Sequence, residues 1–215
     1  MKATVVPNRN AIFSSLLYGT ALSLSEKSGN KSAVALGVHS GDHAIYPDCR
    51  PEFYNALGHA FAIGNWGSEA VHFYLPYVDS NKEGILKDAE HAIGALGLDF
   101  DEVFSRTITS YSPDADGRSS GRTGSDVERI LAFHSLGRKD PIDYVDSWDV
   151  ALEHALATEK AHKEAEYKER LSAIQFHVTR ESGTERAFTG QYYDEKRVGE
   201  CFCICCERLL FTSSM

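Results

Sequence analysis

The sequence has no long hydrophobic run and almost no cysteine outside its last fifteen residues. No stretch approaches the roughly 18 consecutive apolar residues that a membrane-spanning helix needs, and the opening MKATVVPNRN lacks the apolar core of a signal peptide. A disulfide framework is also excluded, because Cys49 stands alone and the other four cysteines crowd together near the C-terminus. We therefore expect a cytoplasmic protein whose C-terminal cysteines take part in metal or redox chemistry.

Positive charge is scarce relative to negative charge. The chain holds 22 Lys and Arg residues against 31 Asp and Glu residues, a formal net charge of −9. A nucleic-acid backbone is therefore an unsuitable direct partner, and nothing suggests a membrane surface. The length of 215 residues allows one good-sized domain with an appendage, and a hydrophobic content of 42% is typical of globular proteins.

The densest polar chemistry lies in residues 40–53, SGDHAIYPDCRPEF. This stretch follows an apolar run, residues 33–38, whose length suits a buried strand. Pro47 and Pro51 stiffen the stretch by fixing the backbone. Charged side chains on a stiff loop after a buried strand are typical of the ligand sites of open α/β sheets. The alternative is a surface turn whose charges only face solvent.

The order of the expected elements predicts a parallel α/β sheet. A helix capped by Asn8 or Asn10 is expected to bury a face formed by Ile12, Phe13, Leu16, Leu17, Ala21 and Leu24. Strands are expected at 33–38, at 71–75 and, more briefly, at 4–6 and 107–111, with a helix over 53–63.

Two further helices are expected in the second half of this region. A capping box of Ser80 and Glu83 predicts a helix that ends at Gly97. Another helix is expected from Asp126 to Gly137, after a loop rich in Ser, Asp and Gly.

Segments of residues 4–144 resemble the 7-cyano-7-deazaguanine synthase family. They are VPNRNAIF at 6–13, VHSGDHAIYPDCRPEF at 38–53, Gly121 with Arg122, and VERILAF at 127–133 continuing to LGRKDP at 136–141. The resemblance implies a ligase of queuosine-precursor synthesis, and hence of tRNA modification, that converts 7-carboxy-7-deazaguanine into its nitrile with ammonia. It also implies ATP with Mg²⁺ as cofactor, and a parallel doubly wound sheet of the adenine-nucleotide α-hydrolase type.

Four side chains are candidates for binding this substrate directly. Arg9 and Asn10 stand at the expected start of the first helix, where the backbone attracts anions. Asp42 and Asp48 carry carboxylates that can accept hydrogen bonds from the amino-pyrimidinone edge of a deazaguanine.

Other polar residues of the loop have two interpretations each. The guanidinium of Arg50 suits a carboxylate ligand or a buried ion pair, and Glu52 is expected either to bind the substrate or to orient Arg50. His43 is the candidate catalytic proton carrier, with His39 as a second. A structural hydrogen bond is the alternative for each histidine.

The chain departs from the resembled family in its phosphate-binding loop. The Ser-Gly-Gly-x-Asp-Ser motif that holds the pyrophosphate in that family does not occur in the sequence. We expect the N-terminal part of the family's sheet to be missing, with ATP bound by a partner chain or a missing segment. A sheet edge or face should then be exposed.

The chain also departs from the family at its structural zinc. The positions that match four zinc-binding cysteines are Ser110, Ser120, Thr123 and Asp126. Hydroxyl groups are poor Zn²⁺ ligands beside thiolates, so we expect this zinc to be absent. The loop over 112–124 is then either looser or held by hydrogen bonds from hydroxyl groups.

The C-terminal third changes character twice. Residues 145–172 are predicted to form a charged helix, either a rigid spacer or a helix packed on the first domain (1–144). Residues 176–212 resemble the N-terminal part of methionine-R-sulfoxide reductase B, through HVTRESGTERAFTGQYYD at 177–194 and CICC at 203–206. The resemblance implies an incomplete β segment (173–215), and makes Cys203 and Cys206 half of a zinc site that needs two more ligands.

Three functional hypotheses follow from these observations. The first is an ATP-dependent ligase of deazaguanine synthesis that needs a partner or a further segment. The second is a non-catalytic module of the same fold that binds a nucleobase or nucleotide, or serves as an interface. The third is a fragment of a sulfoxide reductase, which is disfavoured because the reductase's second cysteine pair and nucleophilic cysteine do not occur in the sequence.

Overall fold

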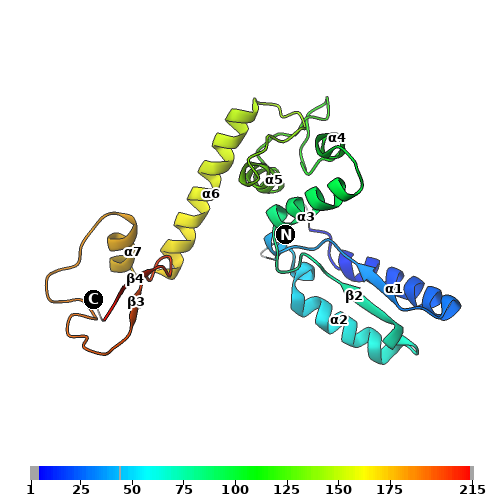
Figure 1. Cartoon of the computed structure of the whole chain (residues 1–215), viewed down its shortest axis with the longest axis horizontal. Coiled ribbons are helices and arrows are strands. Elements are labelled where there is room, and N and C mark those ends of the chain that lie inside the picture. The colour runs from blue at the N-terminus through cyan, green and yellow to red at the C-terminus, as the bar shows by residue number, and fades with distance from the viewer. Residues whose placement is uncertain (1–4, 44, 214–215) are drawn as a thin grey trace. The chain divides into compact units, whose positions relative to one another are not determined.

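The computed structural model of the chain describes residues 5–43 and 45–213, and the chain divides into two compact units, Met1–Leu152 and Glu153–Met215 (Figure 1). The boundary falls inside a helix, and the three-part division into 1–144, 145–172 and 173–215 stays a prediction. The helices and strands are α1 (Arg9–Ser28), β1 (Ser32–Ala35), α2 (Pro51–Gly64), β2 (Val71–Tyr74), α3 (Lys82–Ala95), α4 (Phe100–Ser105), α5 (Gly124–Ser135), α6 (Trp148–Arg170), α7 (Ala173–Arg180), β3 (Glu200–Phe202) and β4 (Leu209–Thr212).

The first unit contains a small parallel sheet with helices on one face. β1 and β2 pair in parallel, with Ser32 opposite Val71. α1 and α2 pack against the same side of this sheet, where the rings of Tyr18 and Phe61 lie 4.6 Å apart beside the buried Val34. On the opposite side the alternating residues of both strands are exposed. The sequence prediction of a parallel α/β arrangement is confirmed at this level, and the larger doubly wound sheet stays a prediction.

The predicted apolar face of α1 is wrong. The buried residues of this helix are Asn10, Ser14, Tyr18, Ala21 and Ser25. Small side chains let the helix approach the sheet closely, as the 2.8 Å hydrogen bond between the hydroxyls of Ser25 and Ser32 illustrates. Of the predicted face only Ala21 is buried, and Ile12, Phe13, Leu16, Leu17 and Leu24 are exposed.

Several predicted boundaries and caps also need correction. Neither Asn8 nor Asn10 caps α1 through its side chain. α3 is capped by the side chain of Asn81, whose oxygen accepts from the Gly84 N–H at 3.0 Å, and the predicted box of Ser80 with Glu83 does not form. No strand forms at 107–111, nor at the described positions 5 and 6. α5 starts two residues earlier than predicted because of a real capping box, Thr123 with Asp126.

The second core of this unit lies between α3, α4 and α5. Its buried apolar side chains come from all three helices: Leu86, Ile93, Phe100, Ala132 and Phe133. Phe133 is fully buried, and its ring meets the rings of Phe100 and Phe104 edge to face at 6.1 and 5.5 Å.

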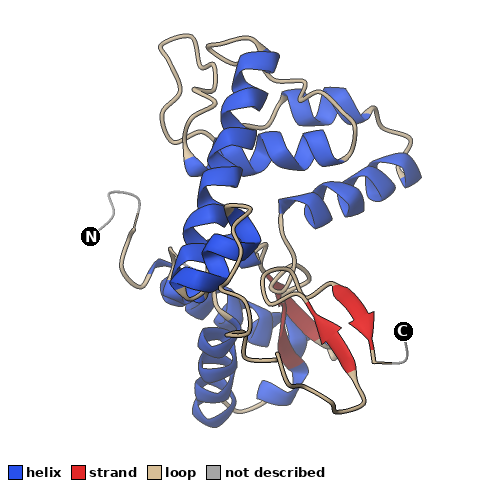
Figure 2. Cartoon of the chain, turned by 90° about the vertical axis from the view of Figure 1, so that its left-hand side faces the viewer, coloured by secondary structure: helices blue, strands red, loops and turns tan. Residues whose placement is uncertain are grey.

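The second unit combines helices with a short hairpin. β3 and β4 pair antiparallel, which gives the chain its second pair of red arrows in Figure 2. α7 begins at a capping box of Ser172 and Gln175, so the segment predicted to be β opens with a helix instead. Arg180 on α7 pairs with Glu164 on α6. In the described parts of both units, no helix is both long enough and apolar enough to cross a membrane.

Replacing Phe133 by Ala tests the α3–α4–α5 core. Removing a fully buried ring leaves a cavity, so Phe133→Ala is expected to lower the free energy of unfolding by about 3–5 kcal/mol in urea denaturation. Leu96→Ala, at a side chain that is 73% exposed, is the control and should change it by less than about 1 kcal/mol. An equal loss of unfolding free energy in Phe133→Ala and Leu96→Ala would contradict the placement of Phe133 in this core.

Candidate ligand-binding groove

An open groove of about 570 Å³ lies between the N-terminal half of α1 and the residues that follow β1. Its polar lining includes Arg9, Asn10 and Asp42, which are three of the predicted substrate ligands. Its apolar lining includes Phe13 and Leu17 from the exposed side of α1. The groove therefore joins flat apolar walls to one cation and one carboxylate, a combination typical of small-molecule sites.

The start of α1 is tied to the predicted substrate loop through Asn10. The backbone N–H of Asn10 donates to Oδ2 of Asp48 at 3.2 Å, and its side-chain amide donates to the Asp48 carbonyl at 3.1 Å. The same amide lies 3.4 Å from Sγ of Cys49. Asp48 thus supplies, from 38 residues away, the carboxylate that α1 lacks at its own N-terminus. Asp48 lies at the helix start and does not line the groove.

Arg9 presents its guanidinium beside two tyrosines. Its Nε donates to Oδ1 of Asn10 at 3.3 Å, and its guanidinium carbon lies 5.7 Å from the ring centroid of Tyr46. Tyr111, from the loop after α4, forms a side-chain hydrogen bond with Tyr46. This bond, followed by burial and the nearby Asp42, raises the pKa of Tyr111. Neither tyrosine was predicted from the sequence as a site residue.

Asp42 is oriented by His39 within the short 3₁₀ helix η1 (Ser40–Asp42). Nδ1 of His39 accepts from the Gly41 N–H at 3.1 Å, so Nε2 is the nitrogen that faces Asp42, at 3.4 Å. Gly41 packs closely on two side chains, since a Cβ there would lie 2.8 Å from Oε1 of Glu128 and 3.0 Å from the ring of His39, so that one of them would have to move. Glu128 in turn pairs with Lys82 at 2.6 Å, which links this loop to α5 and α3.

The remaining predicted site residues of the loop lie off the groove. Arg50 is exposed and donates from Nε to the backbone carbonyl of His43 at 2.7 Å. Glu52 is exposed in the first turn of α2, and within the described residues neither it nor Arg50 forms an ion pair. Nε2 of His43 is buried and has no hydrogen-bond partner in the described part of the chain. The buried ion pair considered for Arg50 is therefore wrong.

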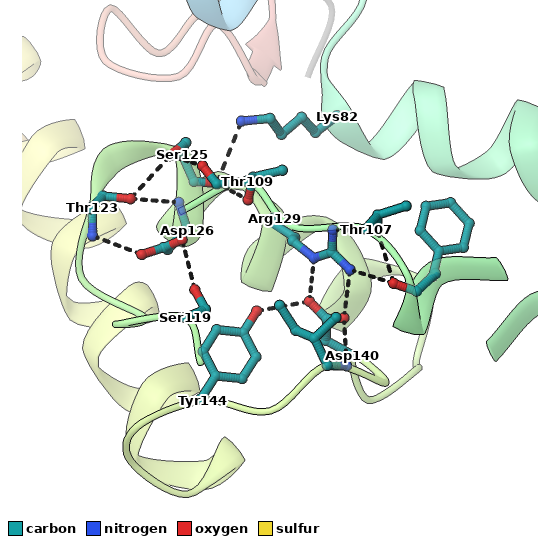
Figure 3. A network of polar contacts seen from close by, with 12 residues as sticks. Lys82, Thr107, Thr109, Ser119, Thr123, Ser125, Asp126, Arg129, Asp140 and Tyr144 are labelled. Carbon is teal, nitrogen blue, oxygen red and sulfur yellow. Dashed lines mark hydrogen bonds and ion pairs between the residues drawn. The ribbon is translucent and has the colours of Figure 1, made fainter. Parts of the chain in front are cut away.

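The four positions that match the family's zinc cysteines do come together, around the carboxylate of Asp126. Figure 3 shows this carboxylate with Thr123 and with the neighbouring Ser119. Oδ2 of Asp126 accepts from the hydroxyls of Ser110 at 3.1 Å and Ser120 at 2.9 Å and from the Thr123 N–H at 3.2 Å. Oδ1 accepts from Ser119 at 2.8 Å. The groups around Asp126 are hydroxyls and one backbone N–H, and each donates its hydrogen to the carboxylate. This set of groups does not fit Zn²⁺, which binds thiolates, imidazoles and carboxylates. The loop is held by hydroxyl hydrogen bonds, as one of the two alternatives predicted.

The groups around Asp126 lower the pKa of its carboxyl. Asp126 is fully buried. Burial by itself raises the pKa of the carboxyl, but the hydrogen bonds from Ser119, Ser120 and Thr123 outweigh burial and hold the pKa below its usual value. The charged carboxylate is therefore the form that the folded loop stabilises.

A buried ion pair fixes α5 beside this cluster. Arg129 donates from Nε and Nη2 to the two carboxylate oxygens of Asp140 at 2.6 and 2.9 Å, and Tyr144 donates to the same carboxylate at 2.7 Å. Arg129 also donates to Thr107 at 2.8 Å. Because each partner is buried, removing one would leave the other charge without compensation.

In the second unit, Cys203 and Cys206 lie on a tight turn between β3 and β4. The Glu207 N–H donates to the Cys203 carbonyl at 2.7 Å, and the Cys203 N–H donates to the Arg208 carbonyl at 2.8 Å. The backbone N–H groups of Cys206 and Cys205 lower the pKa of Cys203. Two thiols fit half of a tetrahedral zinc site, and among the described residues no three His, Cys, Asp or Glu side chains converge on one point.

Comparison with known proteins finds a family match for each of two parts of the chain. Residues 1–137 match the family model described as queuosine biosynthesis protein QueC, and residues 171–215 match the SelR domain. No solved structure matches the chain.

Curated relatives share the first of these parts. The 7-cyano-7-deazaguanine synthase of Psychromonas ingrahamii is 46% identical over 147 residues, which are 68% of this chain and 59% of the relative. The 7-cyano-7-deazaguanine synthase 2 of Colwellia psychrerythraea is 42% identical over 67% of this chain and 58% of the relative. A Rhizobium etli 7-cyano-7-deazaguanine synthase is 42% identical over 74% and 62%, respectively. The chain thus spans about six tenths of the length of these relatives.

Asp126→Asn tests the carboxylate cluster through pH. At pH 7 the variant should lower the free energy of unfolding by about 1–3 kcal/mol, because a neutral amide cannot accept all the hydrogen bonds. A carboxyl whose pKa is lowered in the folded state stabilises the fold above its unfolded pKa of about 3.9 and loses this contribution as pH falls through the folded pKa. The stability loss on acidification should therefore be shallower in the variant.

The matched control for this test is Asp116→Asn, at a side chain that is 78% exposed. It should leave both the stability at pH 7 and the acid slope unchanged within about 0.5 kcal/mol. An unchanged acid slope in Asp126→Asn would contradict the proposed role of the cluster.

Alkylation should separate the two kinds of cysteine. Burial, together with Asp42 and Asp48, raises the pKa of Cys49 to about 11, whereas the pKa of Cys203 is lowered. Because the thiolate is the reactive form, iodoacetamide at pH 7.5 should modify Cys203 at least about 100-fold faster than Cys49 in the folded chain, measured by peptide mass spectrometry. Equal alkylation rates in the folded chain would show that Cys49 is not a buried thiol with a raised pKa. Denaturation in urea should make the two rates equal.

Proposed function

Because the chain belongs to the family described as queuosine biosynthesis protein QueC, we propose that it acts in the synthesis of the 7-deazaguanine precursor of queuosine. In this proposal it is part of an ATP-dependent carbon–nitrogen ligase that converts the carboxyl group of 7-carboxy-7-deazaguanine into a nitrile. The named activity of the curated relatives supports the proposal, and the chain covers about six tenths of each.

The observation that carries the proposal is the convergence of Arg9, Asn10 and Asp42 on one groove. A guanidinium suits the substrate carboxylate, and a carboxylate suits the N–H groups of its pyrimidinone edge. The apolar walls from Phe13 and Leu17 suit the flat ring between these two ends, and a volume of about 570 Å³ lies within the usual range for small-molecule sites.

The other predicted residues act in this proposal by holding the loop. Asp48 binds the N-terminus of α1, so that Arg9 and Asn10 keep their places at the groove. Arg50 braces the loop by its bond to the His43 carbonyl. In this proposal His43 and Arg50 have positioning roles, and neither they nor the exposed Glu52 contacts the substrate.

ATP and Mg²⁺ would supply the activation of the carboxylate as a leaving group. The described residues do not fit this cofactor, because the sequence has no glycine-rich phosphate loop and no cluster of three carboxylates forms in the described ranges. The proposal assigns ATP binding to a partner chain or further segment. The proposed compartment is the cytoplasm, where the five free thiols of the chain would stay reduced.

Calorimetric titration with 7-carboxy-7-deazaguanine tests the substrate site. The wild-type chain is expected to bind, and Asp42→Asn is expected to weaken binding about 10- to 100-fold, because a charge-assisted hydrogen bond to the ligand is lost. Asp149→Asn, at an exposed carboxylate on α6 outside the groove, is the control and should bind like wild type. Failure of the wild-type chain to bind would overturn the proposal.

Turnover separates the ligase from the alternative of a binding module. Chain supplied with ATP, Mg²⁺, ammonia and the polypeptide that corresponds to the rest of a curated relative should release nitrile product. Substrate binding without product under these conditions would favour a nucleobase-binding module of the same fold.

A further inference from the structure

Tyr111 is a large exposed side chain near the groove, and the proposed function gives it no role so far. The residue is 60% exposed, whereas Tyr46, with which its side chain forms a hydrogen bond, is 8% exposed. A tyrosine side chain has one polar group, so the bond joins the two hydroxyls. A single hydroxyl contact thus ties an exposed ring of the loop after α4 to a buried ring of the predicted substrate loop.

The backbone around Tyr111 is itself anchored at the start of α5. The hydroxyl of Ser110 donates to Oδ2 of Asp126 at 3.1 Å, and the N–H of Ser112 donates back to the Ser110 hydroxyl at 3.4 Å. Asp126 is fully buried, so these bonds begin at a fixed point of the fold. The hydroxyl groups gathered around Asp126 therefore hold the segment from which Tyr111 reaches Tyr46.

Tyr46 in turn supports Arg9. The guanidinium carbon of Arg9 lies 5.7 Å from the ring centroid of Tyr46, within the range of a cation–π contact, and its Nε donates to Oδ1 of Asn10 at 3.3 Å. Both of these neighbours are neutral, so they orient the guanidinium without neutralising its charge. Arg9 lines the groove, where this charge can meet an anionic group of a ligand.

Orienting an arginine before the ligand arrives strengthens binding. A free arginine side chain has many rotamers, and ordering it on binding costs free energy. A guanidinium that already rests on a fixed ring meets a carboxylate with less of this cost. A ligand without a negative charge gains little from the same arrangement, because it makes no charge-assisted bond with Arg9.

We propose that Tyr111 is a positioning residue for substrate binding, which holds the hydroxyl of Tyr46, fixes the ring beneath the Arg9 guanidinium, and so favours ligands that carry a carboxylate. Tyr111 acts through Arg9 and makes no contact with the ligand, since the described lining of the groove does not include it. The inference rests on the proposed function for the identity of the ligand.

Two ligands that differ in charge test the inference. The full chain is titrated in a calorimeter with 7-carboxy-7-deazaguanine, which carries the carboxylate, and with the neutral 7-cyano-7-deazaguanine. Tyr111→Phe keeps the ring and removes only the hydroxyl. It should weaken binding of the acid about 3- to 10-fold, because one hydrogen bond behind Arg9 is lost. The Kd of the neutral nitrile should stay within about twofold of wild type.

A second variant shows whether Tyr111 acts through Arg9. Arg9→Gln should itself weaken binding of the acid about tenfold, because it removes the charge that meets the carboxylate. Adding Tyr111→Phe to Arg9→Gln should then change the Kd of the acid by less than about twofold, since the two residues belong to one chain of contacts.

Tyr74→Phe is the matched control. Tyr74 is 55% exposed on β2, and the substitution removes the same hydroxyl at a position outside the groove lining. This variant should bind both ligands like wild type. Urea denaturation should give the same free energy of unfolding for Tyr111→Phe and Tyr74→Phe within about 1 kcal/mol, as expected of exposed positions.

Three results would overturn the inference. The first is an unchanged Kd of the acid in Tyr111→Phe. The second is equal weakening of both ligands, because Tyr111 would then shape the whole groove. The third is an effect of Tyr111→Phe that adds fully to that of Arg9→Gln, because Tyr111 would then act independently of Arg9.

Failure of the inference is distinguishable from failure of the proposed function. Binding of the acid that Asp42→Asn weakens and Tyr111→Phe does not would leave the substrate site standing and overturn the inference alone. A wild-type chain that binds neither ligand would overturn both.

Discussion

The bond between Asn10 and the Asp48 backbone and carboxylate is the interaction on which the rest of the groove depends. It joins the first turn of α1 to a loop 38 residues later, and it satisfies a helix start that has no cap of its own. Arg9 lies next to this bond, and Cys49 is buried beneath it. The groove is thus framed by a helix N-terminus whose position is set by the loop that carries Asp42.

Local signals in the sequence predicted the order of elements well and the buried faces poorly. Short-range propensity was enough to predict β1, β2 and the helix α2 between them in the chain. It was not enough for the buried face of α1, because hydrophobic periodicity assumes that the apolar side of a helix meets the core. In this chain the side of α1 that meets the core carries Ser14 and Ser25 around Tyr18, and the large aliphatic side chains of the helix are exposed. The predicted strand at 107–111 does not form, because Thr109 and Ser110 make hydrogen bonds with Ser125 and Asp126 at the start of α5.

The candidate site was predictable where its residues share a short segment or a family motif. Arg9, Asn10 and Asp42 were found in this way. Tyr111 was not, because its meeting with Tyr46 joins positions 65 residues apart, and no local pattern encodes that contact. Asp126 is an intermediate case. Its match to a metal position was visible in the sequence, but the gathering of hydroxyls around it depends on the folded loop.

The hydroxyl cluster at Asp126 also changes which cellular conditions the fold depends on. A loop closed by serine and threonine hydroxyls needs no metal ion to be delivered before it can fold, and it has no thiols to lose to peroxide. The four cysteines of the second unit lack that immunity. Oxidants should therefore act on the C-terminal hairpin before they reach the groove, where the single cysteine, Cys49, is buried and has a raised pKa.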